Sequence, residues 1–203
     1  EMCVKQPFSY TESQVQAVLK SDSKKLDEKQ IDAIKNALNY RVSAIVGAAG
    51  TGKTQTAAKL TQILAAIGKT SIVLAPSAIA AQQAAKKVGE GKYATIHRFA
   101  RILPEEEDMG EYGTNVAGTG ELLQSSVIIC DEMTMADICT FSSLLHAIKE
   151  NNDVHLVLIG DPAQLPSIGP SGFFQQIDGS KIENLPVAKL TTIYRSSGGG
   201  DYA

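Results

Sequence analysis

The sequence has little cysteine, no excess of positive charge and no long apolar run. Its three cysteines, Cys3, Cys130 and Cys139, have the spacing of neither a metal site nor a disulfide framework, which favours a reducing compartment. The formal net charge is −3 and the pI is near 5.6, so composition provides no broad cationic field for nucleic acid, and any such site must be local. A basic-then-apolar signal region and an apolar stretch approaching ~18 residues are also missing. We therefore expect a cytoplasmic protein without a membrane span.

The apolar and helical patterns predict the class of fold. The 203 residues are 43% hydrophobic, which suffices for the core of one compact enzyme-like domain, and they contain no internal repeat. Apolar runs that predict strands alternate with helical patterns, as in a parallel sheet that helices cover on both faces. The predicted strands are 42–46, 71–75, 127–130, 155–159 and 187–190, and the predicted helices lie near 27–39, 53–67, 78–88 and 136–149. The sequence thus predicts an α/β fold, a parallel β-sheet sandwiched by helices.

The most informative motif is an octapeptide that matches G-x-x-x-x-G-K-[ST] and directly follows the apolar run 42–46. It consists of Gly47, Ala48, Ala49, Gly50, Thr51, Gly52, Lys53 and Thr54. The glycines let successive N–H groups and the start of the next helix point at the β-phosphate of a nucleotide. Lys53 would reach the β- and γ-phosphates, and the Thr54 hydroxyl would take one coordination position on Mg²⁺. A simple Gly-rich turn is the alternative, and the Lys-Thr pair speaks against it.

Two adjacent acids end another buried strand, as the second half of such a site requires. Asp131 and Glu132 directly follow the apolar run 127–130. Asp131 would hold the Mg²⁺ water shell, and Glu132 would orient or deprotonate the attacking water. The alternative is a solvated strand end. The position of the acids after a phosphate loop favours the catalytic interpretation.

A glutamine follows the third apolar run, 155–159. Gln164 comes just beyond the end of that predicted strand, where ligands collect in open α/β sheets. A neutral amide at this place can sense a γ-phosphate without fixing a charge. We therefore count Gln164 among the candidate catalytic residues.

With these motifs, the sequence resembles the superfamily 1 DNA helicases of the 5′→3′ class, and within them the RecD/TraA-like group (exodeoxyribonuclease V alpha-subunit-like). The resemblance covers about residues 26–195, and six motifs occur in the family's order. It implies a RecA-like P-loop NTPase domain that couples ATP hydrolysis to translocation on single-stranded DNA and to duplex unwinding. It also implies that Gln30 pairs with the adenine edge and that Arg195, in the segment Leu190–Arg195, reaches the γ-phosphate. The alternative for Gln30 is an exposed glutamine on a helix without a role in binding, and the alternative for Arg195 is an ordinary surface arginine.

The resemblance also implies contacts with single-stranded DNA. The segment 74–81 is similar to one that touches the strand backbone, although Ser77-Ala78-Ile79 stands where many relatives have Thr-Gly-Arg. The segment 95–99 is similar to the next DNA-contacting motif, whose aromatic residue packs or stacks. The candidate DNA contacts are Pro76, Ser77, Thr95, His97, Arg98 and Phe99.

The family uses two RecA-like domains, so we expect a second one beyond the linker-like residues 196–203. Residues 1–25 are expected to be an N-terminal extension or the end of a preceding element. Residues 104–120 are acidic and Gly-rich, and we expect a loop insertion where relatives carry a hairpin that splits the duplex. Proteins of recombination or conjugation are candidate partners.

Two other classes of protein remain open. A PhoH-like or other P-loop ATPase shares the phosphate loop and a Gly-Asp-x-x-Gln element, but not the 95–99 and 190–195 segments together. A nucleotide-dependent binding module would not hydrolyse ATP, and Lys53, Glu132 and Arg195 speak against it. A GTPase is disfavoured, because the sequence has no Asn-Lys-x-Asp motif to read guanine.

Overall fold

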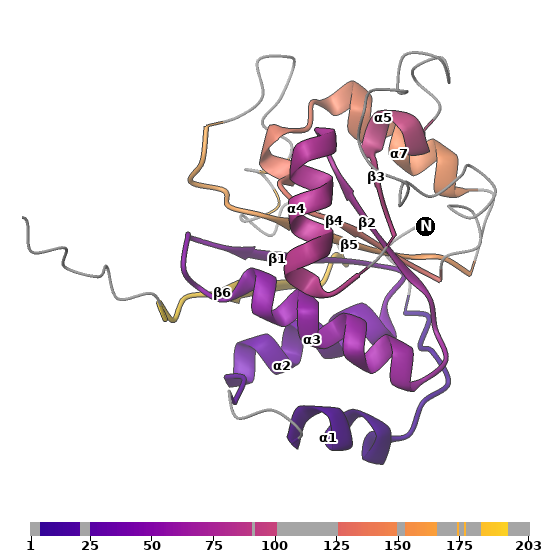
Figure 1. Cartoon of the computed structure of the whole chain (residues 1–203), viewed down its shortest axis with the longest axis vertical. Helices are drawn as coiled ribbons and strands as arrows, with labels where there is room; N and C mark the ends of the chain where they lie inside the picture. The colour runs from indigo at the N-terminus through magenta and orange to yellow at the C-terminus, as the bar shows by residue number, and fades with distance from the viewer. Residues whose placement is uncertain are drawn as a thin grey trace, which may run out of the picture.

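A six-stranded sheet forms the centre of the protein (Figure 1). The computed structural model describes residues 5–20, 25–90, 92–100, 126–149, 153–165, 174, 177 and 184–194. The strands, in chain order, are β1 (Val42–Gly47), β2 (Ser71–Ala75), β3 (Tyr93–Thr95), β4 (Val127–Cys130), β5 (His155–Gly160) and β6 (Val187–Leu190). Their order across the sheet is β3-β2-β4-β5-β1-β6, and all neighbouring pairs are parallel. The predicted α/β fold with a parallel sheet is confirmed.

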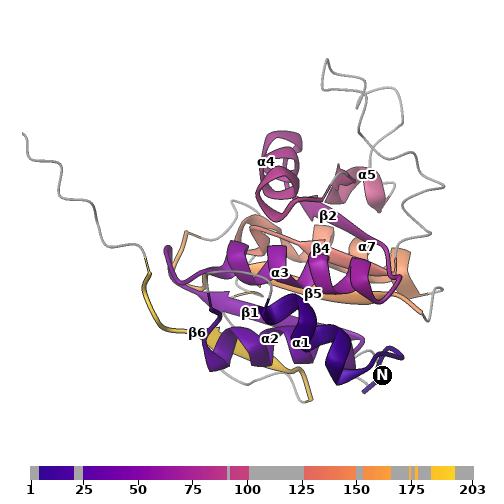
Figure 2. The same cartoon turned by 60° about the horizontal axis from the view of Figure 1, so that its bottom comes forward.

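Helices cover both faces of this sheet (Figures 1 and 2). They are α1 (Glu12–Lys20), α2 (Glu28–Asn39), α3 (Lys53–Ala66), α4 (Ala78–Val88), α5 (Ile96–Phe99), the 3₁₀ helix η1 (Met133–Met135) and α7 (Ile138–Lys149). One core cluster joins α1, α2, α3 and α4 to one face, and a second cluster joins α5 and α7 to the other. Within the described residues, no helix combines the length and the apolar character that a membrane crossing needs.

The burial of both faces explains why the strands are almost continuously apolar in sequence. In β5, Val157 and Ile159 point into the core beneath α2 and α3, whereas Leu156 and Leu158 point into the core beneath α7. Successive side chains of a strand alternate between faces, so a strand covered on both sides has no polar positions to spare. The observed bounds of the strands therefore agree closely with the predicted runs.

Besides α1 and η1, two short elements were not predicted. β3 has only three residues, too few for a periodic signal, and it pairs with β2 at the edge of the sheet. α5 has four residues and follows β3 directly. Both lie in or next to the segment 95–99, for which only a DNA-contacting motif was predicted.

The N-terminal segment is packed against the domain. The Phe8 N–H donates to the Leu38 carbonyl at 3.0 Å, and the Phe8 ring stacks on the His155 ring at 3.8 Å between centroids. Lys59 Nζ, on α3, donates to the Val18 carbonyl of α1 at 3.2 Å. Burial lowers the pKa of His155, which keeps this ring neutral where it meets Phe8. These contacts tie residues 5–20 to the same body as the sheet.

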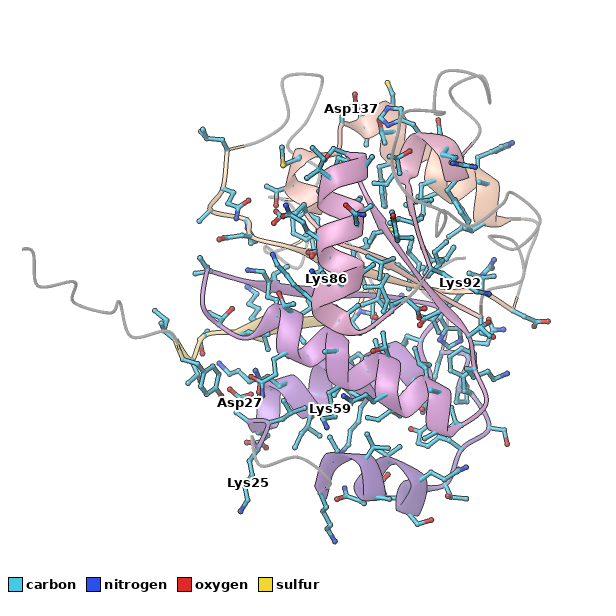
Figure 3. The ribbon with its side chains drawn as sticks, in the orientation of Figure 1. Lys25, Asp27, Lys59, Lys86, Lys92 and Asp137 are labelled. Atoms are coloured by element: carbon cyan, nitrogen blue, oxygen red, sulfur yellow. The ribbon has the colours of Figure 1, made fainter. Side chains whose placement is uncertain are left out.

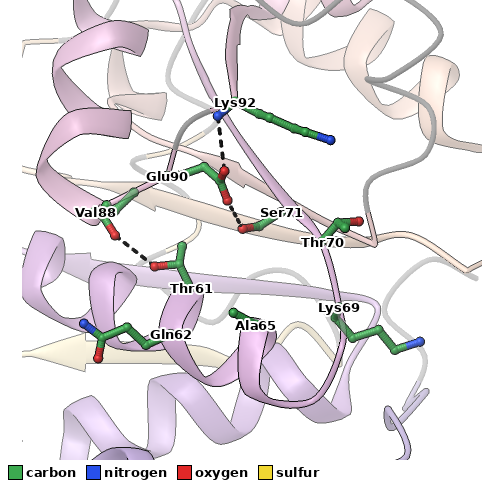
Figure 4. A pocket seen from close by; sticks show the side chains of 10 residues that line it. Thr61, Gln62, Ala65, Lys69, Thr70, Ser71, Val88, Glu90 and Lys92 are labelled. Atoms are coloured by element: carbon green, nitrogen blue, oxygen red, sulfur yellow. Dashed lines mark hydrogen bonds between the residues drawn. The ribbon is translucent and has the colours of Figure 1, made fainter. Parts of the chain in front are cut away.

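A cavity of about 360 Å³ lies where α3 and α4 end and β2 begins (Figure 4). Its polar groups are engaged with one another: the Thr61 hydroxyl donates to the Val88 carbonyl at 2.9 Å, and the Ser71 hydroxyl and the Lys92 N–H both donate to the Glu90 carboxylate. Ser71 is the first residue of β2, so the cavity is at the amino edge of the sheet. It is therefore remote from the loops that follow the carboxyl ends of the strands.

Candidate active site

The order of the strands brings three polar loops to one edge of the sheet. β5 lies between β1 and β4, with Val46 opposite Gly160 and Cys130 opposite Leu158. Because all three strands are parallel, the loops after their carboxyl ends meet at the same edge. The phosphate loop follows β1, the Asp161–Gln164 turn follows β5, and the Asp131–Glu132 pair follows β4. The sequence motifs, which are far apart along the chain, therefore belong to one site.

The phosphate loop has the backbone of an anion cradle. Gly50 and Gly52 have φ angles of 83° and 86°, in the left-handed region that glycine adopts without strain. A side chain on Gly52 would also collide with the Gln30 amide, since an ideal Cβ would lie 2.3 Å from Gln30 Nε2. Lys53 Nζ donates to the carbonyls of Gly47 and Ala48, at 2.6 and 3.1 Å. The lysine is thus folded over the loop at the place where phosphate oxygens would replace these carbonyls as its acceptors.

The start of α2 is held against the phosphate loop. Asp27 caps the helix: its carboxylate accepts from the Gln30 N–H at 2.8 Å, and the Asp27 N–H donates to Gln30 Oε1 at 3.0 Å. Gln30 Nε2 then points at the Thr51 carbonyl, 3.5 Å away. Gln30 is buried, not an exposed helix residue. An adenine contact would use the second lone pair of its oxygen or the second hydrogen of its amide.

Tyr194 closes the same corner and was not singled out from the sequence. Its N–H donates to the Gly50 carbonyl at 2.9 Å, and its hydroxyl donates to Asp27 Oδ2 at 2.8 Å. Although partial burial acts in the opposite direction, the hydrogen bonds from Gln30 and Tyr194 hold the pKa of Asp27 below its ordinary value. Lys29 adds a bond to the Thr191 hydroxyl at 2.7 Å. Residues 191–194, which follow β6, therefore contact both the helix cap and the phosphate loop. Figure 3 labels Asp27 at this corner.

Arg195, the predicted γ-phosphate contact, lies outside the described residues. Its neighbour Tyr194 is described, and it is bonded to the phosphate loop as stated above. The role of Arg195 therefore remains a prediction.

The two acids lie at the end of β4 in a constrained turn. The Asp131 N–H donates to the Leu74 carbonyl at 2.9 Å, which continues the pairing of β4 with β2. Glu132 has a φ of 54°, which is uncommon for a residue other than glycine, and its N–H donates to Asp131 Oδ1 at 2.9 Å. The turn thus directs the two successive carboxylates from a fixed backbone.

The local charges act against each other on this pair. Burial raises the pKa of Asp131, while the Glu132 N–H and the charges of Lys53 and Lys87 oppose the rise. Burial and the neighbouring Asp131 charge raise the pKa of Glu132, and the same two lysines oppose this. Lys87, on α4, was not identified from the sequence. A bound cation would oppose the effects of burial and of the neighbouring charge on both carboxylates, so the raised pKa values are compatible with a metal site.

The oxygen donors fit a magnesium ion that is bound mostly through phosphate and water. Mg²⁺ takes one or two protein ligands together with substrate phosphates, and it does not need a cage of side chains. Thr54, exposed in the first turn of α3, and Asp131, at the end of β4, supply a hydroxyl and a carboxylate. No group of three or more His, Cys, Asp or Glu residues that could hold a metal ion occurs in the described part of the chain.

The turn after β5 carries the candidate sensor. Gln164 is exposed, and its N–H donates to the Asp161 carbonyl at 2.9 Å. Asp161 is buried, and its Oδ1 accepts from the Ala163 N–H at 3.0 Å. The hydroxyl of Thr134, in η1, donates to the Asp161 carbonyl and accepts from the Asp161 N–H. Thr134 was not singled out from the sequence as a site residue.

The candidate DNA contacts lie at the starts of α4 and α5. Two of them act as helix caps: the Ser77 hydroxyl accepts from the Ala80 N–H at 3.2 Å, and the Thr95 hydroxyl accepts from the Arg98 N–H at 3.1 Å. Pro76, His97 and Arg98 are half-buried, and Ser77 is exposed. Phe99, for which packing and stacking were both open, is 4% exposed and packs in the core, so its ring offers no free face to a base.

An acidic residue lies among these candidates. Asp137 accepts from the Thr140 N–H at 2.6 Å, and this bond, with a contribution from the His97 charge, lowers the pKa of Asp137 (labelled in Figure 3). The carboxylate therefore stays charged beside His97, where it weakens the attraction of this surface for phosphate.

Known proteins match most of this chain. A sequence profile described as an AAA domain matches residues 25–201. The chain is 31% identical over 180 residues to an uncharacterized protein of Methanocaldococcus jannaschii, covering 82% of this chain and 15% of that protein. It is 30% identical over 188 residues to the ATP-dependent DNA helicase dda of Enterobacteria phage T4, covering 80% and 42%. It is 31% identical over 193 residues to the RecBCD enzyme subunit RecD of Mycolicibacterium smegmatis, covering 83% and 33%. The chain thus spans less than half the length of each of these relatives.

Solved structures share the fold. A structure of Bacteroides sp Pif1 in complex with ADP-AlF4 has a TM-score of 0.56 at 24% identity, covering 86% of this chain and 44% of the other. Bacteroides Pif1 bound to ssDNA has a TM-score of 0.57 at 22% identity, with the same coverage. These likenesses confirm the RecA-like α/β fold. Together with the helicase relatives, they bear out the resemblance drawn from the motifs.

Proposed function

The chain belongs to the AAA domain family, and we propose that it is the ATP-binding and ATP-hydrolysing first motor domain of a 5′→3′ DNA helicase. The observation that carries this proposal is the meeting of the phosphate loop, the acid pair and the Gln164 turn at the carboxyl edges of three adjacent strands. The helicase relatives dda and RecD support the choice of reaction and of nucleic-acid partner. The proposed role places the protein in the cytoplasm with its DNA.

In the proposed reaction each loop has a separate task. The N–H groups of residues 47–54 bind the β-phosphate, and Lys53 exchanges its bonds to the loop carbonyls for bonds to phosphate oxygens. Thr54 and Asp131 would hold a magnesium ion, which would supply charge neutralisation at the phosphates. Glu132 accepts the proton of the attacking water, and the Gln164 amide contacts the γ-phosphate. Arg195 would stabilise the charge on the phosphoryl group in transfer.

The base of the nucleotide would lie near α2. Gln30 is placed next to Gly52 and Thr51 by the helix cap, so an adenine contact at Gln30 is compatible with phosphates in the loop. The hydrogen bond from the Tyr194 hydroxyl to Asp27 helps to fix the start of α2 next to the phosphate loop. We propose that Gln30 favours adenine over guanine.

Replacing Lys53 by alanine is expected to abolish the binding of ATP with Mg²⁺. The substitution removes the one side-chain cation of the phosphate loop, and with it the contact that spans the β- and γ-phosphates. Fluorescent-nucleotide titration of the 203-residue chain measures the effect. Lys86→Ala makes the same change of charge on the exposed face of α4 and should bind as the parent does. If Lys53→Ala bound ATP as tightly as the parent chain does, the assignment of the loop to the nucleotide site would be wrong.

Single-stranded DNA is expected to bind weakly, with little base preference and with a strong loss of affinity as salt rises. The proposed contacts, at Pro76, Ser77, Thr95, His97 and Arg98, are few and local on an acidic chain, and backbone contacts release counterions. Anisotropy titrations across salt concentrations test this.

Arg98→Ala should weaken DNA binding and lower the salt slope by about one. Lys92→Ala, which lies beside the cavity at the opposite edge of the sheet, serves as the matched control and should leave both unchanged. A preference for duplex DNA, or an affinity that does not change with salt, would contradict the proposed contacts with single-stranded DNA.

A further inference from the structure

The hydroxyl of Thr134 connects two of the three loops of the site. Thr134 Oγ1 donates to the Asp161 carbonyl at 3.2 Å and accepts from the Asp161 N–H at 3.1 Å. Thr134 is 2% exposed and Asp161 is 6% exposed, so no water competes for these groups. One side-chain oxygen of η1 thus satisfies both backbone groups of one residue in the turn after β5.

The last residue of β5 leaves room both for this hydroxyl and for the Phe174 ring. An ideal Cβ on Gly160, the last residue of β5, would lie 2.9 Å from Thr134 Oγ1 and 2.6 Å from the Phe174 ring. A side chain at position 160 would therefore crowd both the Phe174 ring and the Thr134 hydroxyl, and at least one of the two would have to shift. The glycine before Asp161 and the buried bonds at Asp161 are separate signs that the sequence keeps room for this contact.

The contact between Thr134 and Asp161 links the turns of Glu132 and Gln164, the two residues that face the γ-phosphate in the proposed reaction. On one side, the Met135 N–H donates to the Glu132 carbonyl at 3.0 Å, which closes the turn that carries Thr134 around the left-handed Glu132. On the other side, the Asp161 carbonyl that accepts from Thr134 also accepts from the Gln164 N–H at 2.9 Å. One carbonyl is therefore shared by the turn of the base and the turn of the amide.

We propose that Thr134 is a positioning residue that fixes the Glu132 turn and the Gln164 turn in one geometry, so that the general base and the γ-phosphate amide move as a unit. This inference rests on the proposed ATPase function. Thr134 itself touches no reacting atom. Its hydroxyl acts through Asp161, and a valine, which has the same shape but no hydroxyl, would leave the buried Asp161 N–H without its acceptor.

The test compares Thr134→Val with Thr134→Ser, which keeps the hydroxyl. Amide hydrogen exchange of the free 203-residue chain should rise in residues 131–136 and in residues 161–165 together in the valine variant, and should stay near the parent's in the serine variant. A rise confined to 131–136, or no rise in either segment, would overturn the coupling. Urea unfolding of each variant shows that the comparison is made between folded proteins.

A second measurement concerns the site itself. Affinities for ADP with Mg²⁺ and for ADP-AlF4 with Mg²⁺ are measured for both variants, because the second ligand mimics the phosphoryl group in transfer. Thr134→Val should keep ADP affinity within about twofold and lose about tenfold or more of the preference for ADP-AlF4, while Thr134→Ser keeps it. In a Gln164→Ala background the valine substitution should have little further effect. Equal losses for the two ligands would show a merely structural role.

Gly160→Ala supplies an independent route to the same disturbance. Its Cβ crowds the Thr134 hydroxyl and the Phe174 ring without changing Thr134, and it should raise hydrogen exchange in the same two segments together. A rise confined to one of the two segments would overturn the inference. A parent chain that binds neither ADP nor ATP would instead contradict the proposed function, and the hydrogen-exchange result would still decide whether Thr134 couples the two turns.

Discussion

A protein that joins this chain to a second RecA-like motor domain is expected to hydrolyse ATP about 10³–10⁵ times faster than the 203-residue chain alone, and single-stranded DNA should stimulate only the longer form. The physical reason is the open edge of the site: Thr54 and Gln164 are both exposed in this structure. A second domain would cover that edge, exclude water and insert an arginine at the transferring phosphate. The helicase relatives, of which this chain covers 42% and 33%, have room for such a domain.

Phosphate release by both forms, with and without single strands, measures this difference. Lys53→Ala in the longer form sets the background, because it cannot bind the nucleotide. Brisk DNA-stimulated hydrolysis by the 203-residue chain would mean that one domain completes the site, and the proposed two-domain motor would then be wrong.

Replacing Glu132 by glutamine in the two-domain protein is expected to lower ATP turnover by about 10²–10⁴ while ATP binding survives. The amide keeps the shape of the side chain and its place in the constrained turn, but it cannot take a proton from water. Because burial and the Asp131 charge raise the pKa of Glu132, turnover of the parent should fall as the pH drops through that raised pKa, at a higher pH than an ordinary glutamate would give. Steady-state kinetics from acid to neutral pH would reveal both effects.

The neighbouring acid provides the control for this experiment. Asp131→Asn should weaken the Mg²⁺ dependence of ATP binding, whereas Glu132→Gln should leave it intact, since only Asp131 is assigned to the metal. A metal titration that does not distinguish the two variants would contradict their separate roles.

The sequence predicted the elements of the fold better than their arrangement. β1, β2, β4 and β5 are runs of apolar residues buried on both faces, so hydrophobicity alone marks them. The three residues of β3 are too few to give a periodic signal. The order of the strands is not written in any local pattern, because it depends on which crossover connections pack together. Only the structure shows that β5 separates β1 from β4.

Some residues of the candidate site could be predicted from the sequence, and others could be found only from the structure. The phosphate loop and the acid pair are contiguous motifs whose chemistry follows from residue type and spacing. The contacts of Tyr194 with Asp27 and of Thr134 with Asp161 join residues distant in sequence, and a tyrosine or threonine has many ordinary uses. Phe99 was ambiguous for a related reason: an aromatic residue in a nucleic-acid motif and one in a core look alike until burial is known.

The position of β5 fixes the distance between the strand that precedes the phosphate loop and the strand that carries the acid pair. Neighbouring strands lie about 4.8 Å apart, so one intervening strand sets the phosphate-loop strand and the acid-bearing strand roughly 10 Å from each other. This spacing is set by backbone pairing and not by the length of chain between Lys53 and Glu132. A change in the length of the chain between two of these strands would therefore leave the base in place relative to the phosphates, as long as the strands keep their pairing.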